Sequence, residues 1–161
     1  MKHLRNIFSI LYFSSLAIFF SCQSNHNGKV DPSKIEIEIL SLEQNGPDPS
    51  NNILKFRSIK DTNRILFMSA GATEAQTLAI SLKGLKPDYP LPLDLFEEAS
   101  NKFGFKISEV VIDDLIDDIY TAKIIVTQNN KVIEFKARPI DAATIAVKNR
   151  CPIYVSSKLL P

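Results

Sequence analysis

Apolar and polar residues alternate along much of this chain with the period of a β-strand. Residues Lys34–Leu42 place Ile35, Ile37 and Ile39 on one side and glutamates on the other, which predicts a half-buried strand at a sheet edge. Shorter apolar segments bounded by turn residues predict six further strands. They span Ile53–Ile59, Ile65–Ser69, Lys106–Ile112, Tyr120–Val126, Lys131–Ala137 and Ile153–Val155.

Three segments carry apolar residues at helical spacing. The first, Thr73–Leu85, opens with Thr73 and Gln76 in a capping-box pattern. The other two are Leu91–Phe103 and Ile140–Lys148. Several strands around about three short helices predict an α+β fold, a single compact domain with a mixed β-sheet.

The start of the chain has the pattern of an export signal. Basic residues precede an apolar run, Ile7–Phe20, that is too short for a comfortable membrane span. The following Ser21-Cys22 resembles a bacterial lipoprotein cleavage site. We therefore expect a signal peptide over 1–21, a palmitate-bearing lipid anchor on Cys22, a flexible tether over 22–33 and a folded domain over 34–161.

Two other interpretations of this segment stay open: ordinary signal cleavage, or an uncleaved anchor with an incidental cysteine. If Cys22 is acylated, the protein is anchored to the cell envelope through lipid and does not span the membrane. Gln23, in place of Asp, resembles lipoproteins directed to the outer membrane.

The near-neutral net charge and the few cysteines and histidines limit the chemistry that the chain can perform. The whole chain has a formal charge of +1, and without the signal it is about −1. Nucleic-acid binding would therefore need a local basic patch. Its candidates are Arg57, Lys60, Arg64, Lys136, Arg138, Lys148 and Arg150. With His26 the one histidine after the signal, Cys151 is expected to be a buried structural thiol rather than a nucleophile.

The segment Lys136–Ala146 combines an Arg and an Asp where a strand gives way to a helix. Pro139 suits the first helical position. Asp141 falls in the first turn, where the helix dipole favours a negative charge. Arg138 can hold an anion or pair with a carboxylate, so the segment predicts either a site or a capped helix with an ion pair.

Several segments together resemble the bifunctional nuclease (BFN) domain family. Arg138–Ala142 is similar to its Arg-Pro-Ser-Asp-Ala motif, Gly71–Ala75 to its Gly-x-x-Glu-Ala segment, and Pro90–Leu95 to its Arg-Pro-Leu-Thr-His-Asp-Leu. Gly84 matches the end of the family's first helix, and Ile153–Val155 its closing strand. The resemblance runs from about Ile53 to Leu160.

The resemblance implies a nuclease that cleaves DNA and RNA. Its motif positions are Glu74, Asp94, Arg138 and Asp141, which become candidate catalytic residues, and the three acids become candidate ligands for Mg²⁺ or Mn²⁺. Nucleic acid is the expected partner, and self-association into a homo-oligomer is implied by the family alone. Helix capping by itself also accounts for the three acids.

The chain departs from the family pattern at several motif positions. Leu93 replaces the histidine, Lys136 an aspartate and Ile140 the serine, while Tyr89 and Pro92 replace Arg and Thr. The alternative function is thus a non-catalytic envelope lipoprotein that uses the fold for protein contacts.

Acidic and aromatic residues elsewhere have simpler explanations. The acidic run Glu109–Asp118 lacks the spacing of a calcium loop, so we expect a solvated turn. Six aromatic residues lie in apolar contexts and are expected in the core. They are Phe67, Phe96, Phe103, Phe105, Tyr120 and Phe135.

Overall fold

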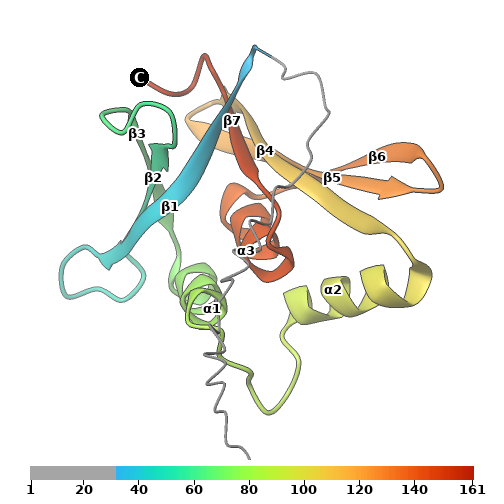
Figure 1. Cartoon of the computed structure of the whole chain (residues 1–161). Helices are drawn as coiled ribbons and strands as arrows, with labels where there is room; N and C mark the ends of the chain where they lie inside the picture. Colours follow the sequence, from blue (N-terminus) through green and yellow to red (C-terminus); the bar gives the residue numbers. More distant parts are fainter. Residues whose placement is uncertain (1–31) are drawn as a thin grey trace, which may run out of the picture.

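One mixed β-sheet and three helices make up the part of the chain that the computed structural model describes, residues 32–161 (Figure 1). The strands are β1 (Lys34–Gln44), β2 (Asn52–Ser58), β3 (Ile65–Ala70), β4 (Lys106–Ile116), β5 (Ile119–Gln128), β6 (Lys131–Ala137) and β7 (Ile153–Ser156). The helices are α1 (Ala72–Leu82), α2 (Pro92–Phe103) and α3 (Pro139–Asn149). This confirms the predicted α+β class.

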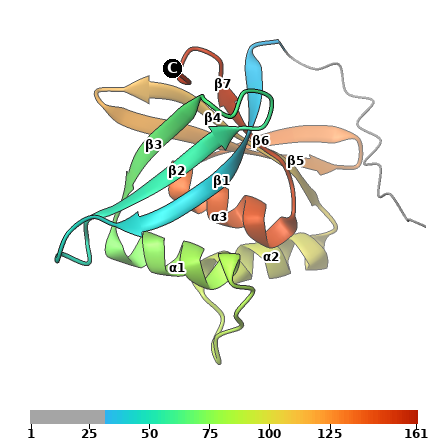
Figure 2. The ribbon, with the colours of Figure 1, turned by 60° about the vertical axis from the view of Figure 1, so that its left-hand side comes forward.

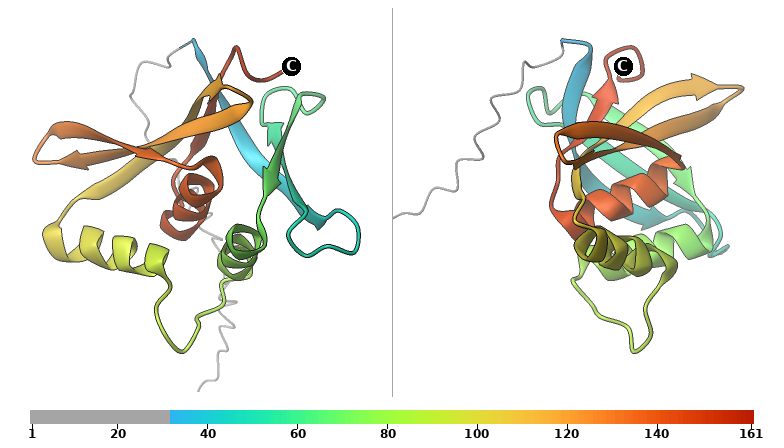
Figure 3. Two further views of the ribbon diagram at one scale, coloured as in Figure 1. Left: turned by 180° about the vertical axis from the view of Figure 1, so that it is seen from behind. Right: turned by 90° about the vertical axis from the view of Figure 1, so that its right-hand side faces the viewer.

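The sheet has the strand order β3-β2-β1-β7-β4-β5-β6. All neighbours are antiparallel except β4 and β7, which run parallel. Strands β1–β3 form one wing and β4–β6 the other, with α3 between the two wings (Figures 1 and 3). Helices α1 and α2 lie beneath α3 in the view of Figure 2.

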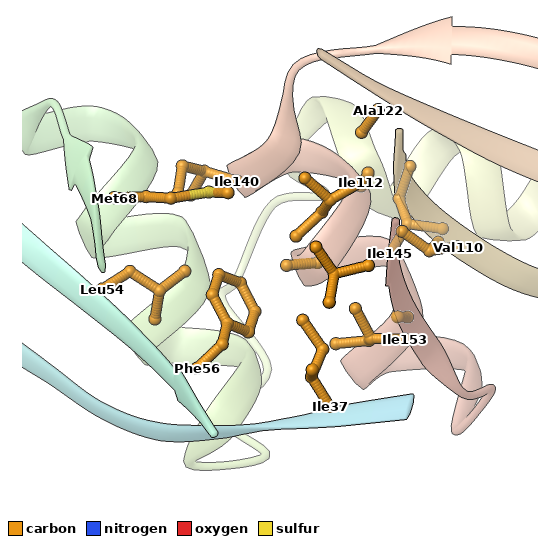
Figure 4. Packing of buried hydrophobic residues seen from close by; sticks show 14 of the residues in the cluster. Ile37, Leu54, Phe56, Met68, Val110, Ile112, Ala122, Ile140, Ile145 and Ile153 are labelled. Carbon is orange, nitrogen blue, oxygen red and sulfur yellow. The ribbon is translucent and has the colours of Figure 1, made fainter. Parts of the chain in front are cut away.

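The core lies where the two wings meet α3. Leu54 and Phe56 of β2 and Ile112 of β4 point from the two wings into the same core as Ile145 of α3 (Figure 4). Helix α3 presents small residues to its neighbours: Ala142, Ala143 and Ala146 are fully buried. Small side chains let a helix approach its neighbours closely, so α3 occupies the centre of the molecule.

The predicted elements are all present, with shifts of a few residues at their ends. The largest shift is in β4, which continues past Ile112 to Ile116 before a two-residue turn at Asp117 and Asp118. Both aspartates have positive φ, 49° and 62°, as a tight hairpin turn requires. The predicted turn at Asn129-Asn130 has the same conformation.

The prediction that Lys34–Leu42 lies at a sheet edge is wrong. Strand β1 pairs with β2 on one side and with β7 on the other. Its glutamates mark the solvated face of an antiparallel sheet rather than an open edge. The edges are β3 and β6, the two strands that lead into α1 and α3.

Half of the predicted core aromatics are exposed instead. Phe67, Phe103 and Phe135 are exposed, because β3 and β6 are edge strands and Phe103 ends α2. The expectation holds for Phe96, Phe105 and Tyr120, which pack against the core. The ring of Phe96 contacts those of Phe105 and Phe135, with centroids 5.7 and 6.1 Å apart.

The structure does not test the predictions made for the N-terminal segment. The predicted signal peptide 1–21, the lipidated Cys22 and nearly all of the tether lie outside the described residues. Within residues 32–161, no helix has both the length and the apolar character needed to cross a membrane.

Candidate functional site

The first part of the site is the start of α1, directly after edge strand β3. Gly71 is the N-cap residue, and Glu74 Oε2 accepts a hydrogen bond of 3.0 Å from its backbone N–H. The cap predicted at Thr73 with Gln76 is therefore wrong. The cap lies two residues earlier, at Gly71, because Gly71 and Glu74 have the same spacing as Thr73 and Gln76, and the Glu74 carboxylate fulfils the role expected of Gln76.

The second part is the start of α3, directly after edge strand β6. Arg138 is the N-cap residue, Pro139 begins the helix and Asp141 lies in the first turn, as predicted. Arg138 Nε donates a hydrogen bond of 2.7 Å to Asp141 Oδ2. The ion pair expected from the sequence is thus present.

The two helix starts meet in one cluster, because α1 and α3 pack against each other. Arg138 Nη1 lies 2.7 Å from Glu74 Oε1, so a single guanidinium joins both helices. The Arg138 side chain is 69% exposed, whereas those of Glu74 and Asp141 are 22% and 25% exposed. The hydrogen bond and charge of Asp141, then the charge of Glu74, raise the pKa of Arg138 above its ordinary value.

The fourth predicted residue, Asp94, lies elsewhere. Its Oδ2 accepts the Leu91 N–H at 2.6 Å, and its Oδ1 pairs with Lys148 near the end of α3. Lys148 follows Asp141 by seven residues, which is about 10 Å along a helix. Asp94 therefore does not join the Arg138 cluster.

Lys148 and Asp94 form a partly buried charge pair. The Lys148 hydrogen bond lowers the pKa of Asp94. Burial alone would lower the pKa of Lys148, but the Asp94 hydrogen bond and the charges of Asp94 and Glu97 raise it overall. Glu97 Oε2 lies 3.5 Å from Lys148 Nζ. This group connects α2 to α3.

The three acids do not assemble as a metal site would need. Among residues 32–161, no three His, Cys, Asp or Glu side chains group closely enough to hold a metal ion. Glu74 and Asp141 are joined by Arg138, which pairs with both carboxylates. A metal cation would have to compete with this guanidinium for the same carboxylate oxygens. The donor set does not fit a resident Mg²⁺ or Mn²⁺ ion, which prefers several oxygen ligands.

Four of the seven candidate basic residues, Arg57, Arg64, Arg138 and Lys148, have partners at different places on the domain. Arg57 pairs with Glu38 on the sheet. Arg64 donates hydrogen bonds to the carbonyl oxygens of Leu160 and Pro161 at the chain end. Since Lys148 is also paired, Arg138 is the member of this set that combines a carboxylate cluster with a largely exposed guanidinium.

The remaining predictions concern the acidic run and Cys151. Asp117 and Asp118 form an exposed turn, as expected, while Asp113 and Asp114 lie in β4 and pair with Lys123 and Lys158. Cys151 is half-buried against the core, and burial raises the pKa of its thiol to about 11. A thiol with so high a pKa is a poor nucleophile at neutral pH.

Comparison with known proteins identifies the family. The model of the bifunctional nuclease domain matches residues 56–161, which contain all three helix starts described above. The chain belongs to the bifunctional nuclease domain family. The matched segment begins within β2 and includes the whole Arg138 cluster.

Two curated proteins from Mycobacterium tuberculosis are similar to this BFN domain. They come from strains CDC 1551 / Oshkosh and H37Rv, and both are described as uncharacterized proteins. Each is 32% identical over 112 residues, covering 70% of this chain. The alignment spans 66% of each relative's own length, just under two thirds.

The residues that depart from the BFN motifs lie either in or against the core or on the surface. Ile140 is buried in the core, and the partly buried Leu93 packs against the core. Lys136 lies exposed on β6. The sequence indicated Lys148 as a candidate for a basic patch but not as the partner of Asp94, because only the packing of α2 against α3 brings the two residues together.

Proposed function

We propose that this BFN domain is a nuclease that hydrolyses phosphodiester bonds of DNA or RNA at the cluster of Glu74, Arg138 and Asp141. The observation that carries the proposal is the 2.7 Å pairing of Arg138 with Glu74 and with Asp141. Family membership supplies the reaction class, and the cluster is where two matched motifs meet.

The chemistry of the cluster suits a phosphate ligand. Arg138 is largely exposed, and its Nη1 and Nε are the atoms that lie 2.7 Å from Glu74 and Asp141. A guanidinium binds phosphate oxygens through parallel hydrogen bonds. Glu74 and Asp141 are then placed beside the bound phosphate, where a carboxylate can accept the proton of an attacking water.

Asp94 takes a different role in this proposal. Because it pairs with Lys148 rather than with Arg138, it acts as a positioning residue that fixes α2 against α3. The described acids do not fit a resident ion, so a Mg²⁺ or Mn²⁺ ion would need the phosphate of the bound nucleic acid as a further ligand. Activity is therefore to be measured with each ion and with a chelator.

The test compares residues 23–161 with variants on single- and double-stranded DNA and RNA. Asp141→Asn and Glu74→Gln are each expected to reduce cleavage by about 100-fold or more. Asp114→Asn is the matched control, because Asp114 is an exposed carboxylate that also pairs with a basic residue. No cleavage above a mock preparation, or equal loss in the control, would refute the proposal.

One observation favours the non-catalytic alternative. Arg138 is already paired with two carboxylates, so a phosphate must compete with both for its guanidinium. If the domain uses its fold only for protein contacts, the wild-type domain and Asp141→Asn will both fail to cleave or bind nucleic acid while remaining folded.

We also propose that the domain is carried to the cell envelope by a lipid on Cys22, with the outer membrane as its location. The proposal rests on the N-terminal sequence pattern. Metabolic labelling with a palmitate analogue should mark the wild-type chain and not Cys22→Ala. Equal labelling of both chains would refute the anchor, and fractionation of the two membranes would test its location.

A further inference from the structure

The strand β6 is an open, partly apolar edge of the sheet. It ends the strand order, and its residues Lys131–Lys136 are all exposed. Val132, Ile133 and Phe135 are 66%, 41% and 42% exposed. At the other edge, β3, Phe67 is the one comparably exposed large apolar residue. Uncovered apolar edge strands are templates for pairing with another strand.

The hairpin register shows which backbone groups of β6 face outward. The turn Asn129-Asn130 places Gln128 opposite Lys131, and pairs beside such a turn are hydrogen-bonded. Because hydrogen-bonded and non-hydrogen-bonded pairs alternate, Ile133 and Phe135 bond to β5. Val132, Glu134 and Lys136 then direct their N–H and C=O groups away from the sheet, where no described strand pairs with them.

We propose that a second copy of this chain pairs along β6, antiparallel, with the two-fold axis at Phe135. In this register Glu134 lies opposite Lys136 of the second copy, and the reverse pair forms by symmetry. Cross-strand pairs of opposite charge stabilise a sheet. The outward N–H and C=O groups of Glu134 and Lys136 meet in the same pairs and exchange hydrogen bonds.

Charge selects this register over its neighbours. An axis at Glu134 would place the two copies of Glu134 directly opposite each other, which is unfavourable. An axis at Ile133 would set Val132 against Glu134. Of these three axes, only the one at Phe135 sets Glu134 against Lys136, and it does so twice; Glu134 also pairs with Lys123 of its own sheet.

The other face of the strand also favours the Phe135 axis. Phe135 lies opposite the buried Ile124 in β5 and rests against Phe96 of α2, so its ring is held on the core side of the sheet. At the two-fold axis it meets Phe135 of the second copy. Aromatic cross-strand pairs stabilise sheets and would cover two exposed rings.

The β6 pairing would supply the surface for the self-association that the family resemblance implies. It does not depend on cleavage: the nuclease assay reports on the Arg138 cluster and the experiments below on β6, so either proposal can fail alone.

A disulfide tests the register. In the full chain with Cys22→Ala, Phe135→Cys should give a covalent dimer on mild oxidation, because non-hydrogen-bonded partners have Cα atoms about 4.5 Å apart. Ile133→Cys is the control, since its two copies would lie roughly 13 Å apart. Cross-linking at residue 133 equal to that at residue 135, or no more cross-linking than in the Cys22→Ala parent, would overturn the proposal.

Charge exchange tests the pairing without a new cysteine. Glu134→Lys and Lys136→Glu should each weaken dimerisation of the full chain in detergent roughly tenfold. An equal mixture of the two variants should restore the dimer, because every cross-strand pair is then complementary. A monomeric wild-type chain by light scattering, or a mixture no more dimeric than its components, would refute it.

Discussion

At the scale of single residues, two similar acids have different roles because of what faces them. Asp94 and Asp141 both lie in the first turn of a helix. Asp141 meets an exposed arginine of its own helix, whereas Asp94 meets a lysine of α3 that is only 18% exposed. Loss of the less solvated pair, Asp94 with Lys148, should lower the stability of the domain more, because exposed ion pairs contribute little.

Asp94→Asn should lower the free energy of unfolding by roughly 1–2 kcal/mol at pH 7. The folded pKa of Asp94 is lowered from its ordinary 3.8, so its contribution is complete above that value and is lost as pH falls through the lowered pKa. The raised pKa of Lys148 preserves the pair until the pH exceeds 10.5. Urea unfolding at several pH values measures the difference.

The control for this prediction is Glu98→Gln on the same helix. Glu98 pairs with Lys102, but both side chains are at least half exposed. That substitution should change stability by less than about 0.5 kcal/mol at any of these pH values. A difference for Asp94→Asn that persists unchanged at pH 2 would contradict the assignment to this charge pair.

At the scale of elements, the helix ends show where local sequence and local geometry agree or conflict. The C-cap residue that follows α2 is Gly104, with a left-handed φ of 69°, which glycine adopts easily. The C-cap residue that follows α3 is Arg150, with a φ of 52°, a conformation that strains a side-chain-bearing residue. The two helices therefore use the same ending with different amounts of strain.

Arg150→Gly should stabilise the domain by roughly 0.5–1 kcal/mol, because the left-handed conformation no longer strains a Cβ. Asn149→Gly, one residue earlier and inside α3, is the matched control and should destabilise by about 1 kcal/mol. Thermal unfolding of both variants measures the effects. The expectation fails if the two glycines shift the midpoint in the same direction.

At the scale of the whole molecule, α3 is the element around which the sheet wings are arranged. It leads from edge strand β6 back to β7 in the middle of the sheet, and it contacts α1, α2, β4 and β5. The Arg138 cluster exists because this central helix starts beside the start of α1. Close packing along α3 therefore supports both the core and the site.

Ala146→Leu should destabilise the domain by about 1–3 kcal/mol, because the fully buried Ala146 has no room for added methyl groups. Ala72→Leu, at the exposed start of α1, is the control and should have little effect. Denaturant unfolding monitors both. Equal midpoints for the two variants would show that α3 does not fill the centre as described.

The amino-acid sequence by itself determined the kinds of element and much of the Arg138 site. Alternation, turn residues and helix-start residues are local, so every strand and helix was predictable, and Arg138 with Asp141 lies within one turn. The motifs at Gly71–Ala75 and Arg138–Ala142 also indicated the BFN family.

Only the tertiary structure decided which elements are neighbours. It placed β1 inside the sheet, left Phe67 and Phe135 exposed at the edges, joined Glu74 to Arg138 and separated Asp94 from them. The physical reason is that strand order and helix packing follow from burial of the whole core. Alternation along one segment reports which face is buried, but not what lies beside it.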